Sequence, residues 1–299
     1  MWHRHHEAVA VGVVDVGSNT VRLLVAEGDR PVLQLREALG LGAAVEEHGL
    51  IPSEKLAETA DVVARFVDAA REAGTAALEI LVASPGRQAA NADDLIEALA
   101  TASRSPVRVL SAADEGRLAF LGALGSVRVP ARKIVAVVDV GGGSAQVTIG
   151  SRRTGPVWVR SIDLGSLRLT RRCLPDDPPG LDAAEAARHE VARVLERFAP
   201  PLPGRAFAVG GSARAVRRMV GDDLDASSLA EAVRIAATTP AAELVDRWGM
   251  NPTRGRTVAG GAIILEALQA TLDTPLEVVR AGLREGALTE LGNRLAAAA

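Results

Sequence analysis

The chain has 299 residues, 48% of them hydrophobic and 24% charged, and this composition excludes a disordered or fibrous protein. The formal net charge of −3 excludes a protein-wide basic field for nucleic acid or an anionic membrane, so any polyanion must be bound locally. A single cysteine, Cys173, permits no internal disulfide and fits a reducing cytoplasm. No apolar run reaches the roughly 18 residues of a membrane-spanning helix. The terminal histidines at 3, 5 and 6 are interpreted as solvated rather than metal-binding.

In the first half of the chain, apolar patterning predicts three strands followed by alternating helices and strands. Ser53 is predicted to be the N-cap of the first long helix. The predicted strands are Val11–Val14, Val21–Ala26, Val32–Leu39, Leu78–Ala83 and Val107–Leu110, and the predicted helices are Ser53–Ala73, Asn91–Thr101 and Ala112–Leu124.

The second half is predicted to repeat this plan, which is typical of a mixed α/β fold. A small, proline-bearing segment at 125–132 is the best candidate for a hinge between the halves. At roughly 150 residues per domain, the length also predicts two domains. The predicted strands are Lys133–Val138, Ala145–Ile149, Val157–Ile162, Ala206–Val209 and Leu276–Val279, and the predicted helices are Asp182–Phe198, Ala213–Val220, Leu229–Ala236, Ala241–Trp248, Val258–Leu272 and Arg284–Ala297.

A sequence motif that occurs twice supports a duplicated domain. The letters Val-Val-Asp-Val-Gly at 13–17 recur at 137–141, and small residues and a second β-rich segment follow both copies. The aspartates, Asp15 and Asp139, are 139 − 15 = 124 residues apart, which is too far for a solenoid repeat. This spacing fits one domain duplicated once.

Each copy of the motif ends in a turn of small residues. Such a turn is suited to binding phosphate, because its backbone N–H groups form a concave nest. The two turns are predicted to clamp a phosphate chain from both sides, with Asp15 and Asp139 orienting a cation or its water. The alternative is that Asp-x-Gly simply makes a tight hairpin. A third anion site is predicted before a helix, at the N–H groups of Gly210-Gly211-Ser212. The turn residues are Gly17, Ser18, Asn19 and Thr20 in the first copy and Gly141, Gly142, Gly143 and Ser144 in the second.

Three charged side chains complete the predicted site. Ser111 and Asp114 have capping-box spacing, so Glu115 lies in a first helical turn, where it either complements the helix dipole or activates a water as general base. Arg22 in the second strand and Arg87 after a Ser-Pro-Gly turn either bind phosphate in a fork geometry or are solvated.

Seven motifs in order resemble the exopolyphosphatase/guanosine pentaphosphate phosphatase (Ppx/GppA) family, over nearly the whole chain. The loop at 174–180 is most similar to short actinobacterial members, which lack an extra C-terminal helical domain. The motifs are Asp15–Leu24, Ala83–Asn91, Asp114–Leu118, Asp139–Ser144, Asp163–Thr170, Gly210–Ser212 and Gly282–Gly286.

This resemblance implies a duplicated actin-like α/β fold of the RNase H-like, Hsp70-like ATPase superfamily, with mixed sheets. The implied domains are 1–125, with a C-terminal helix at about 284–299 packing back on it, and 133–283. The implied activity is Mg²⁺-dependent removal of the terminal phosphate of inorganic polyphosphate, or of the 5′ γ-phosphate of pppGpp. Glu115 matches the catalytic base, and Asp15 and Asp139 match carboxylates associated with metal. The implied phosphate-binding positions are Arg22, Arg87, the residues of both turns, Gly211 and Ser212.

One departure from the family pattern bears on the metal. Gln146 stands where the family usually has an acidic residue in its second loop. This change favours an alternative in which the protein is a catalytically weak sensor that binds pppGpp or polyphosphate. A kinase of the same superfamily is a further alternative, which phosphate release without an acceptor would exclude. The expected location is the cytoplasm, and a homodimer is left open.

Overall fold

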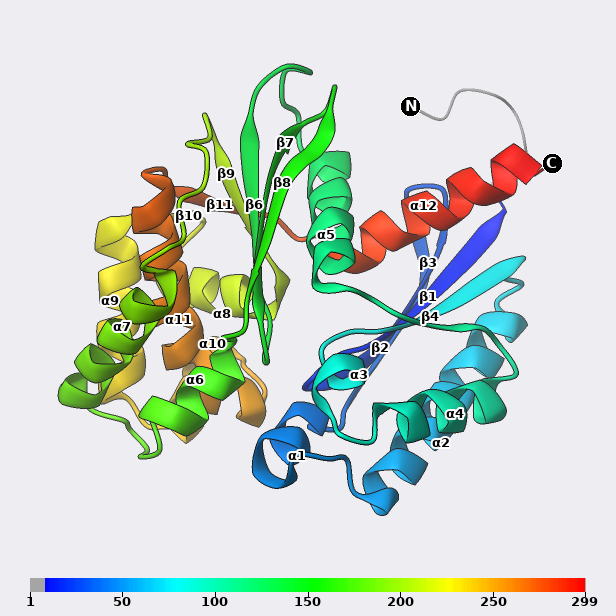
Figure 1. Cartoon of the computed structure of the whole chain (residues 1–299), viewed down its shortest axis with the longest axis horizontal. Helices are drawn as coiled ribbons and strands as arrows, with labels where there is room; N and C mark the ends of the chain where they lie inside the picture. The colour runs from blue at the N-terminus through cyan, green and yellow to red at the C-terminus, as the bar shows by residue number, and fades with distance from the viewer. Residues whose placement is uncertain (1–8, 299) are drawn as a thin grey trace. The chain divides into compact units, whose positions relative to one another are not determined.

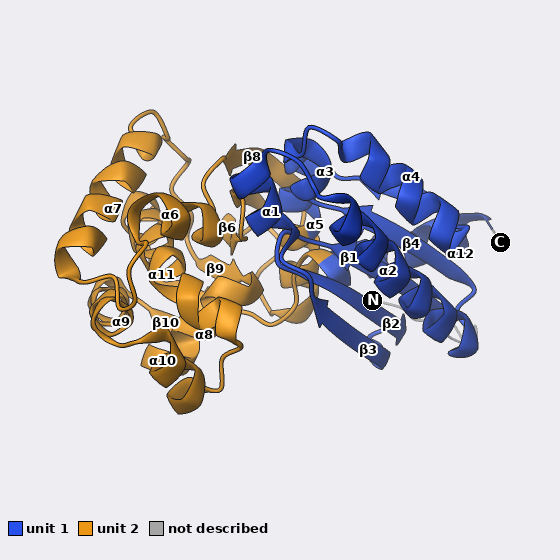
Figure 2. Ribbon diagram, turned by 90° about the horizontal axis from the view of Figure 1, so that it is seen from below, with its two compact units in different colours: residues 1–118, 284–299 blue, residues 119–283 orange. Residues whose placement is uncertain are grey.

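The computed structural model describes residues 9–298, so the terminal histidines lie outside the described residues. The chain forms two compact units: unit 1 comprises Met1–Leu118 and Arg284–Ala299, and unit 2 comprises Ala119–Leu283 (Figure 2). The division therefore falls inside the helix α5 (Ala112–Ser126). The hinge expected at 125–132 stays a prediction. Within residues 9–298, no helix combines the length and the apolar character needed to span a lipid bilayer.

Unit 1 is built on a five-stranded sheet of order β3-β2-β1-β4-β5 (Figure 1). The first three strands form antiparallel pairs, whereas β4 and β5 run parallel to β1. The strands are β1 (Ala10–Val16), β2 (Thr20–Glu27), β3 (Arg30–Ala38), β4 (Ala77–Val82) and β5 (Val107–Val109), and the helices between them are α1 (Leu41–His48), α2 (Ser53–Glu72), α3 (Pro85–Gln88) and α4 (Ala92–Ser103).

Alternation along β1 separates a core face from a site face. Val14 and Val16 pack in the hydrophobic core with Phe66 of α2 and Leu95 of α4. Asp15 points to the other face, because successive side chains of a strand alternate. The C-terminal helix α12 (Leu283–Ala298) lies on this second side, opposite α2 and α4 (Figure 1). The helix α12 therefore packs in unit 1, on the same side of the sheet as Asp15.

Unit 2 repeats the plan with a six-stranded sheet of order β10-β11-β9-β6-β7-β8. Strands β6, β7 and β8 are antiparallel neighbours, and β9 runs parallel to β6. The strands are β6 (Val135–Val140), β7 (Ala145–Ser151), β8 (Gly155–Ile162), β9 (Ala206–Val209), β10 (Asp223–Leu224) and β11 (Leu276–Val278), and the helices are α6 (Ser166–Cys173), α7 (Leu181–Leu195), α8 (Gly210–Val220), α9 (Ala226–Thr238), α10 (Ala241–Trp248) and α11 (Pro252–Leu272).

The two faces of this sheet also differ. Val138 and Val140 belong to the large core beneath α11, whose central turns are buried on all sides. Val135 and Val137 pack on the other face against Phe120 of α5. By alternation, Asp139 shares this second face, as Asp15 does in unit 1.

The backbone confirms that the two halves share a mixed α/β plan. Asp15 pairs across its hairpin with Arg22, and Asp139 occupies the same place opposite Gln146. The sequence patterns missed α1, α3 and α6. The predicted Ser53 N-cap is wrong, because Pro52 is the N-cap of α2 and Ser53 is the first residue of the helix. Arg87, expected at a strand end, lies instead in the single turn of α3.

Candidate active site

The first turn, at 17–20, offers backbone N–H groups to a ligand. Its ends are closed by a hydrogen bond from the Gly17 N–H to the Thr20 carbonyl, 3.1 Å. The Ser18 and Asn19 carbonyls accept hydrogen bonds from the N–H groups at 39, 40 and 42. Among the described residues, the N–H groups of Ser18 and Asn19 have no hydrogen-bond acceptor, and the buried Asn19 Oδ1 also has no partner. The turn is therefore held by its carbonyls and presents its donors, as an anion nest requires.

The second turn, at 141–144, is built in the same way. The Gly141 N–H donates to the Ser144 carbonyl at 2.9 Å, and the carbonyls of Gly141 and Gly142 accept from the first N–H groups of α6. Within residues 9–298, the N–H groups of Gly142 and Gly143 have no acceptor. Gly165 makes this docking possible, because a Cβ there would lie 2.4 Å from the Gly142 carbonyl carbon and oxygen.

A third group of donors gathers at the start of α8. Gly210 has a φ of +85°, and a Cβ there would lie 2.3 Å from Asp139 Oδ1, so only glycine lets this carboxylate approach. Arg254 Nη1 donates to Ser212 Oγ at 3.0 Å and lies 3.4 Å from Ser166 Oγ. A cation beside a helix N-terminus is unfavourable by itself. The combination of N–H groups and a guanidinium is suited to an anion.

In unit 1, a chain of contacts runs from the first turn to Glu115. Ser18 and Ser84 share a buried hydroxyl hydrogen bond of 2.6 Å. Three residues later, Arg87 Nη1 donates to Glu115 Oε1 at 2.8 Å and also to the Leu110 carbonyl. Glu115 is only 6% exposed, whereas the Arg87 side chain is 24% exposed, so the carboxylate is the more shielded member of this ion pair. The pair orients the carboxylate and compensates its burial.

The start of α5 fixes where Glu115 lies. Ser111 Oγ accepts a hydrogen bond from the Asp114 N–H at 3.0 Å and donates to Asp114 Oδ2 at 2.7 Å. The Ser111 N-cap predicted from the spacing is thereby confirmed. Because Ser111 and Asp114 hold the first turn, the direction of the next side chain is set by the helix rather than by a loop.

Asp15 lies among charges contributed by both ends of the chain. Burial raises the pKa of Asp15 above its usual value, while the charges of Arg284 and Arg22 oppose this rise and that of Glu285 adds to it. Arg284 and Glu285 open α12. The first hairpin and the last helix therefore combine into one polar group.

The donor set around Asp15 fits Mg²⁺. This ion is usually held by one or two carboxylates, several waters and substrate phosphates. Asp15 and Glu285 are close enough for each charge to act on the other. Residues 9–298 contain no group of three or more His, Cys, Asp or Glu side chains arranged for a metal, so a cation here would depend on its waters and on phosphate.

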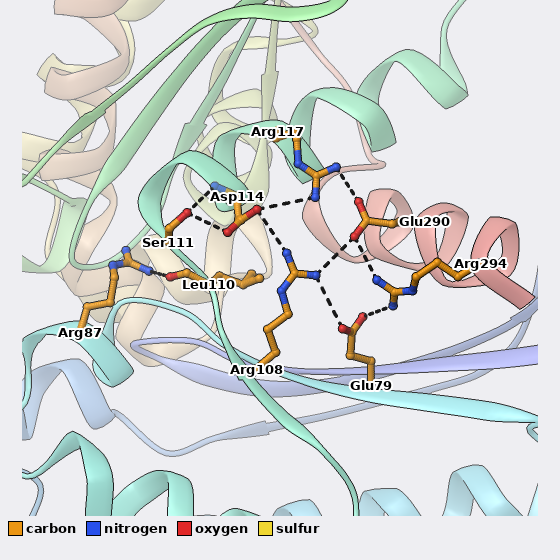
Figure 3. Close-up of polar contacts among 9 residues, drawn as sticks. All are labelled: Glu79, Arg87, Arg108, Leu110, Ser111, Asp114, Arg117, Glu290 and Arg294. Atoms are coloured by element: carbon orange, nitrogen blue, oxygen red, sulfur yellow. Dashed lines mark hydrogen bonds and ion pairs between the residues drawn. The ribbon is translucent and has the colours of Figure 1, made fainter.

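A cluster of six charged side chains joins α12 to the start of α5 (Figure 3). Arg108 lies 3.2 Å from Asp114, 3.3 Å from Glu290 and 3.6 Å from Glu79. Glu290 also pairs with Arg117 and Arg294, and Arg294 reaches Glu79 at 3.0 Å. The cluster therefore ties the helix turn before Glu115 to the C-terminal helix and to β4.

We expect Glu290→Gln to lower the free energy of unfolding by about 1–2 kcal/mol at pH 7, because three arginines lose a charged partner. Burial raises the pKa of Glu290, but the hydrogen bonds and charges of Arg117 and Arg108 outweigh it, so this pKa lies below its usual value. A lowered pKa contributes stability above the unfolded-state value of about 4.3, which is lost as pH falls through the folded-state value. Urea unfolding at pH 7 and pH 3.5 measures both effects.

The exposed Glu231, which pairs with Arg234 alone, gives a matched control. Glu231→Gln is expected to leave stability nearly unchanged, because exposed ion pairs contribute little. Equal effects of the two substitutions at pH 7 would show that the cluster adds nothing beyond ordinary surface pairs.

The structure brings most predicted residues together within their own units. Ser18, Arg87 and Glu115 are linked through Ser84, and Arg22 stands beside Asp15. In unit 2, Asp139 meets the Gly210 backbone and Ser212 Oγ donates to the Val140 carbonyl, 2.8 Å away. A clamp formed by both turns stays a prediction, as do the roles of these residues.

Four residues with a place in these groups were not singled out from the sequence: Ser84, Arg254, Arg284 and Glu285. Ser84, Arg284 and Glu285 lie within motifs that carry the family resemblance, and this was the available signal. Arg254 had none, because its contact with Ser212 joins residues 42 positions apart.

The chain is similar to known proteins of one family. The model of a family described as the Ppx/GppA phosphatase family matches residues 24–294. The chain is 30% identical to exopolyphosphatase 1 of Mycobacterium tuberculosis, covering 92% of this chain and 86% of the relative. It is 27% identical to exopolyphosphatase 2 of the same species, covering 88% and 90%.

Solved structures share the fold. An exopolyphosphatase from Cytophaga hutchinsonii superposes with a TM-score of 0.84 at 22% identity, covering 95% of this chain and 98% of the other. The Aquifex aeolicus member of the Ppx/GppA family gives a TM-score of 0.81 at 22% identity, covering 97% and 98%. The predicted duplicated actin-like α/β fold is thereby confirmed.

Proposed function

Because the chain belongs to the Ppx/GppA phosphatase family, we propose that it is an exopolyphosphatase that releases the terminal phosphate of inorganic polyphosphate. The observation that carries the proposal is the buried Glu115 carboxylate, which Arg87 orients. Arg87 is linked through Ser84 to the first turn, whose Ser18 and Asn19 N–H groups have no acceptor within residues 9–298. The two mycobacterial relatives bear the name exopolyphosphatase, which supports this substrate.

In the proposed reaction, Glu115 accepts a proton from a water whose oxygen attacks the terminal phosphorus. The bond from that phosphorus to the bridging oxygen breaks, giving orthophosphate and a chain one unit shorter. Arg87 donates to the carboxylate and orients it, as the positioning of a general base requires. The N–H groups of the turns bind the charged phosphate oxygens and position the substrate. Glu115 moves one proton.

Asp15 and Asp139 are the residues proposed to hold Mg²⁺. Bound there, the ion would neutralise charge on the phosphate oxygens. Asp15 contributes from the first hairpin with Glu285 nearby. Asp139 contributes from the second hairpin, where Gly210 leaves room for its carboxylate.

The observation that favours a weak sensor instead is the setting of Gln146. This side chain is 4% exposed, and its Nε2 donates to Ser144 Oγ at 2.9 Å and Ser161 Oγ at 3.4 Å. An amide in this place brings no negative charge to the Asp139 face of the sheet. The site therefore supports phosphate binding more fully than metal binding.

Phosphate release from polyphosphate and from pppGpp, each with and without Mg²⁺, tests the proposal. We expect release from polyphosphate that depends on Mg²⁺. Phosphate release from pppGpp but not from polyphosphate would show that pppGpp is the substrate. Binding of either compound without phosphate release would favour the sensor. The cytoplasmic location and a homodimer stay predictions.

We expect Gln146→Glu to lower the Mg²⁺ concentration for half-maximal hydrolysis by about tenfold. A carboxylate in this position adds charge beside Asp139, and groups supporting a metal commonly shift its affinity by about 10–100-fold. Ser144 and Ser161 are placed to donate to the new carboxylate. A Mg²⁺ titration of phosphate release at saturating substrate measures the shift, and superimposable curves would show that Gln146 does not act on the metal.

A further inference from the structure

Three neighbouring loops of unit 2 carry six basic side chains and no acidic one, in a chain whose net charge is −3. The loops are residues 127–134 between α5 and β6, residues 151–156 around the β7–β8 turn, and residues 201–205 before β9. We name them the basic loop cluster. Its basic residues are Arg128, Arg132, Lys133, Arg152, Arg153 and Arg205.

Hydrogen bonds hold the three loops side by side. The Arg153 N–H donates to the Ala131 carbonyl at 2.9 Å, which joins the first two loops. The Gly204 N–H donates to the Ile134 carbonyl at 2.9 Å, which joins the first and third. The α5–β6 loop and the β7–β8 turn lie at the upper end of the unit 2 sheet in Figure 1. The basic side chains therefore share one surface.

Most of this charge is available to a partner. Arg205 is neutralised by Glu277 at 2.6 Å, whereas the other five side chains are exposed. None of these five forms an ion pair within residues 9–298. Arg152 donates to the carbonyls of Leu124, in the last turn of α5, and of Val127, and neither acceptor carries a formal charge. Five positive charges on one surface produce a local potential that attracts a polyanion.

The chemistry of the loops favours polyphosphate over nucleic acid. Sites for single-stranded nucleic acid combine basic residues with aromatic side chains on which bases stack. The three loops contain no Phe, Trp or Tyr. Charge without stacking surfaces matches a polyanion that consists of phosphates alone.

We propose that the basic loop cluster is a second, non-catalytic binding site for long-chain inorganic polyphosphate. The proposal rests on the proposed function, which supplies this substrate class. Lys133 precedes β6 and Asp139 lies near its other end, so the cluster is about 20 Å from the second turn at a strand rise of about 3.3 Å per residue. A chain bound at the cluster raises the effective concentration of its end at the turn. Tripolyphosphate is too short to gain from this.

Binding is tested by equilibrium titration in the Glu115→Gln background, so that the chain is not consumed. The test variant is R128A/R132A/R153A, whose three side chains are exposed and make no ion pair within residues 9–298. We expect its affinity for long-chain polyphosphate to fall at least about tenfold at low salt. The log–log salt slope should fall by about 2, at about 0.7 per lost contact. Affinity for tripolyphosphate should not change.

The matched control is R172A/R197A/R247A, which removes the same charge from exposed arginines of unit 2 that lie outside the cluster and make no ion pair within residues 9–298. R128K/R132K/R153K keeps the charge and should bind like the parent. With an active Glu115, the test variant should raise KM for long chains about tenfold and leave kcat, and both constants for tripolyphosphate, unchanged. This split distinguishes a binding surface from a damaged fold.

Unchanged long-chain affinity in the test variant, an equal loss in the control, or an equal loss for tripolyphosphate would each overturn the proposal. If the parent bound single-stranded RNA but no polyphosphate, and the test variant lost the RNA binding, the assignment of polyphosphate as the ligand would be overturned. Phosphate release is measured separately. A protein that binds long chains through the cluster but hydrolyses none would refute the proposed function and leave the second site standing.

Discussion

Glu115→Gln is expected to lower kcat for phosphate release by about 10²–10⁴-fold, which is the usual contribution of a general base. Glutamine keeps the length of the side chain and an oxygen that accepts from Arg87 Nη1, so the hydrogen bond at 2.8 Å persists without the proton acceptor. Folding and polyphosphate affinity should therefore stay near those of the wild type. Steady-state kinetics, a thermal melt and a binding titration measure the three quantities.

The exposed Glu231→Gln provides the control for this experiment, because it makes the same chemical change far from any predicted site residue in sequence. Its kcat should match the wild type. A Glu115→Gln protein with wild-type turnover would contradict the assignment of the base. An unfolded variant would show instead that the carboxylate is needed to compensate Arg87.

Gly165→Ala is expected to reduce kcat/KM by about 10²-fold, a loss that a displacement of about 1 Å in a catalytic group can cause. The new Cβ would lie 2.4 Å from the Gly142 carbonyl and 2.6 Å from the Ser144 nitrogen. Both are backbone atoms, so the turn or α6 must shift. Overpacking of this kind also lowers the free energy of unfolding by about 1–3 kcal/mol. Kinetics and urea unfolding measure the two effects.

Gly125→Ala is the matched control, since a Cβ there meets nothing within 4 Å and its φ is not in the left-handed region. It should leave kinetics unchanged and should not lower stability, because alanine is favoured over glycine within a helix such as α5. If Gly165→Ala behaved in the same way, the second turn would not depend on its contact with α6, and its placement would have to come from β6 and β7 alone.

The hairpins at Asp15 and Asp139 could be predicted because their signals are local. A buried strand, a carboxylate and small residues follow one another in sequence, and the β1–β2 and β6–β7 ladders form where these patterns place them. The Ser111 N-cap was equally local. The two turns and the start of α5 therefore follow from short stretches of sequence.

The helix α6 could not be predicted from its residues, because three arginines in eight positions obscure its apolar spacing. Arg168 is 5% exposed and pairs with Asp163, an arrangement that only the tertiary structure supplies. Arg254 was missed for a related reason. The apolar pattern indicated a helix from Val258, whereas α11 begins at Pro252 with Asn251 as its N-cap.

The discontinuity of unit 1 has a consequence for how the protein is made. Chains emerge from the ribosome N-terminus first, and domains generally fold as units. The strand with Asp15 is synthesised before unit 2, yet Arg284, Glu285 and Glu290 are synthesised after it. Unit 2 is complete in sequence before unit 1 has its final helix. During translation, the polar groups around Asp15 and Arg108 therefore lack their α12 partners until residues 284–290 have been synthesised.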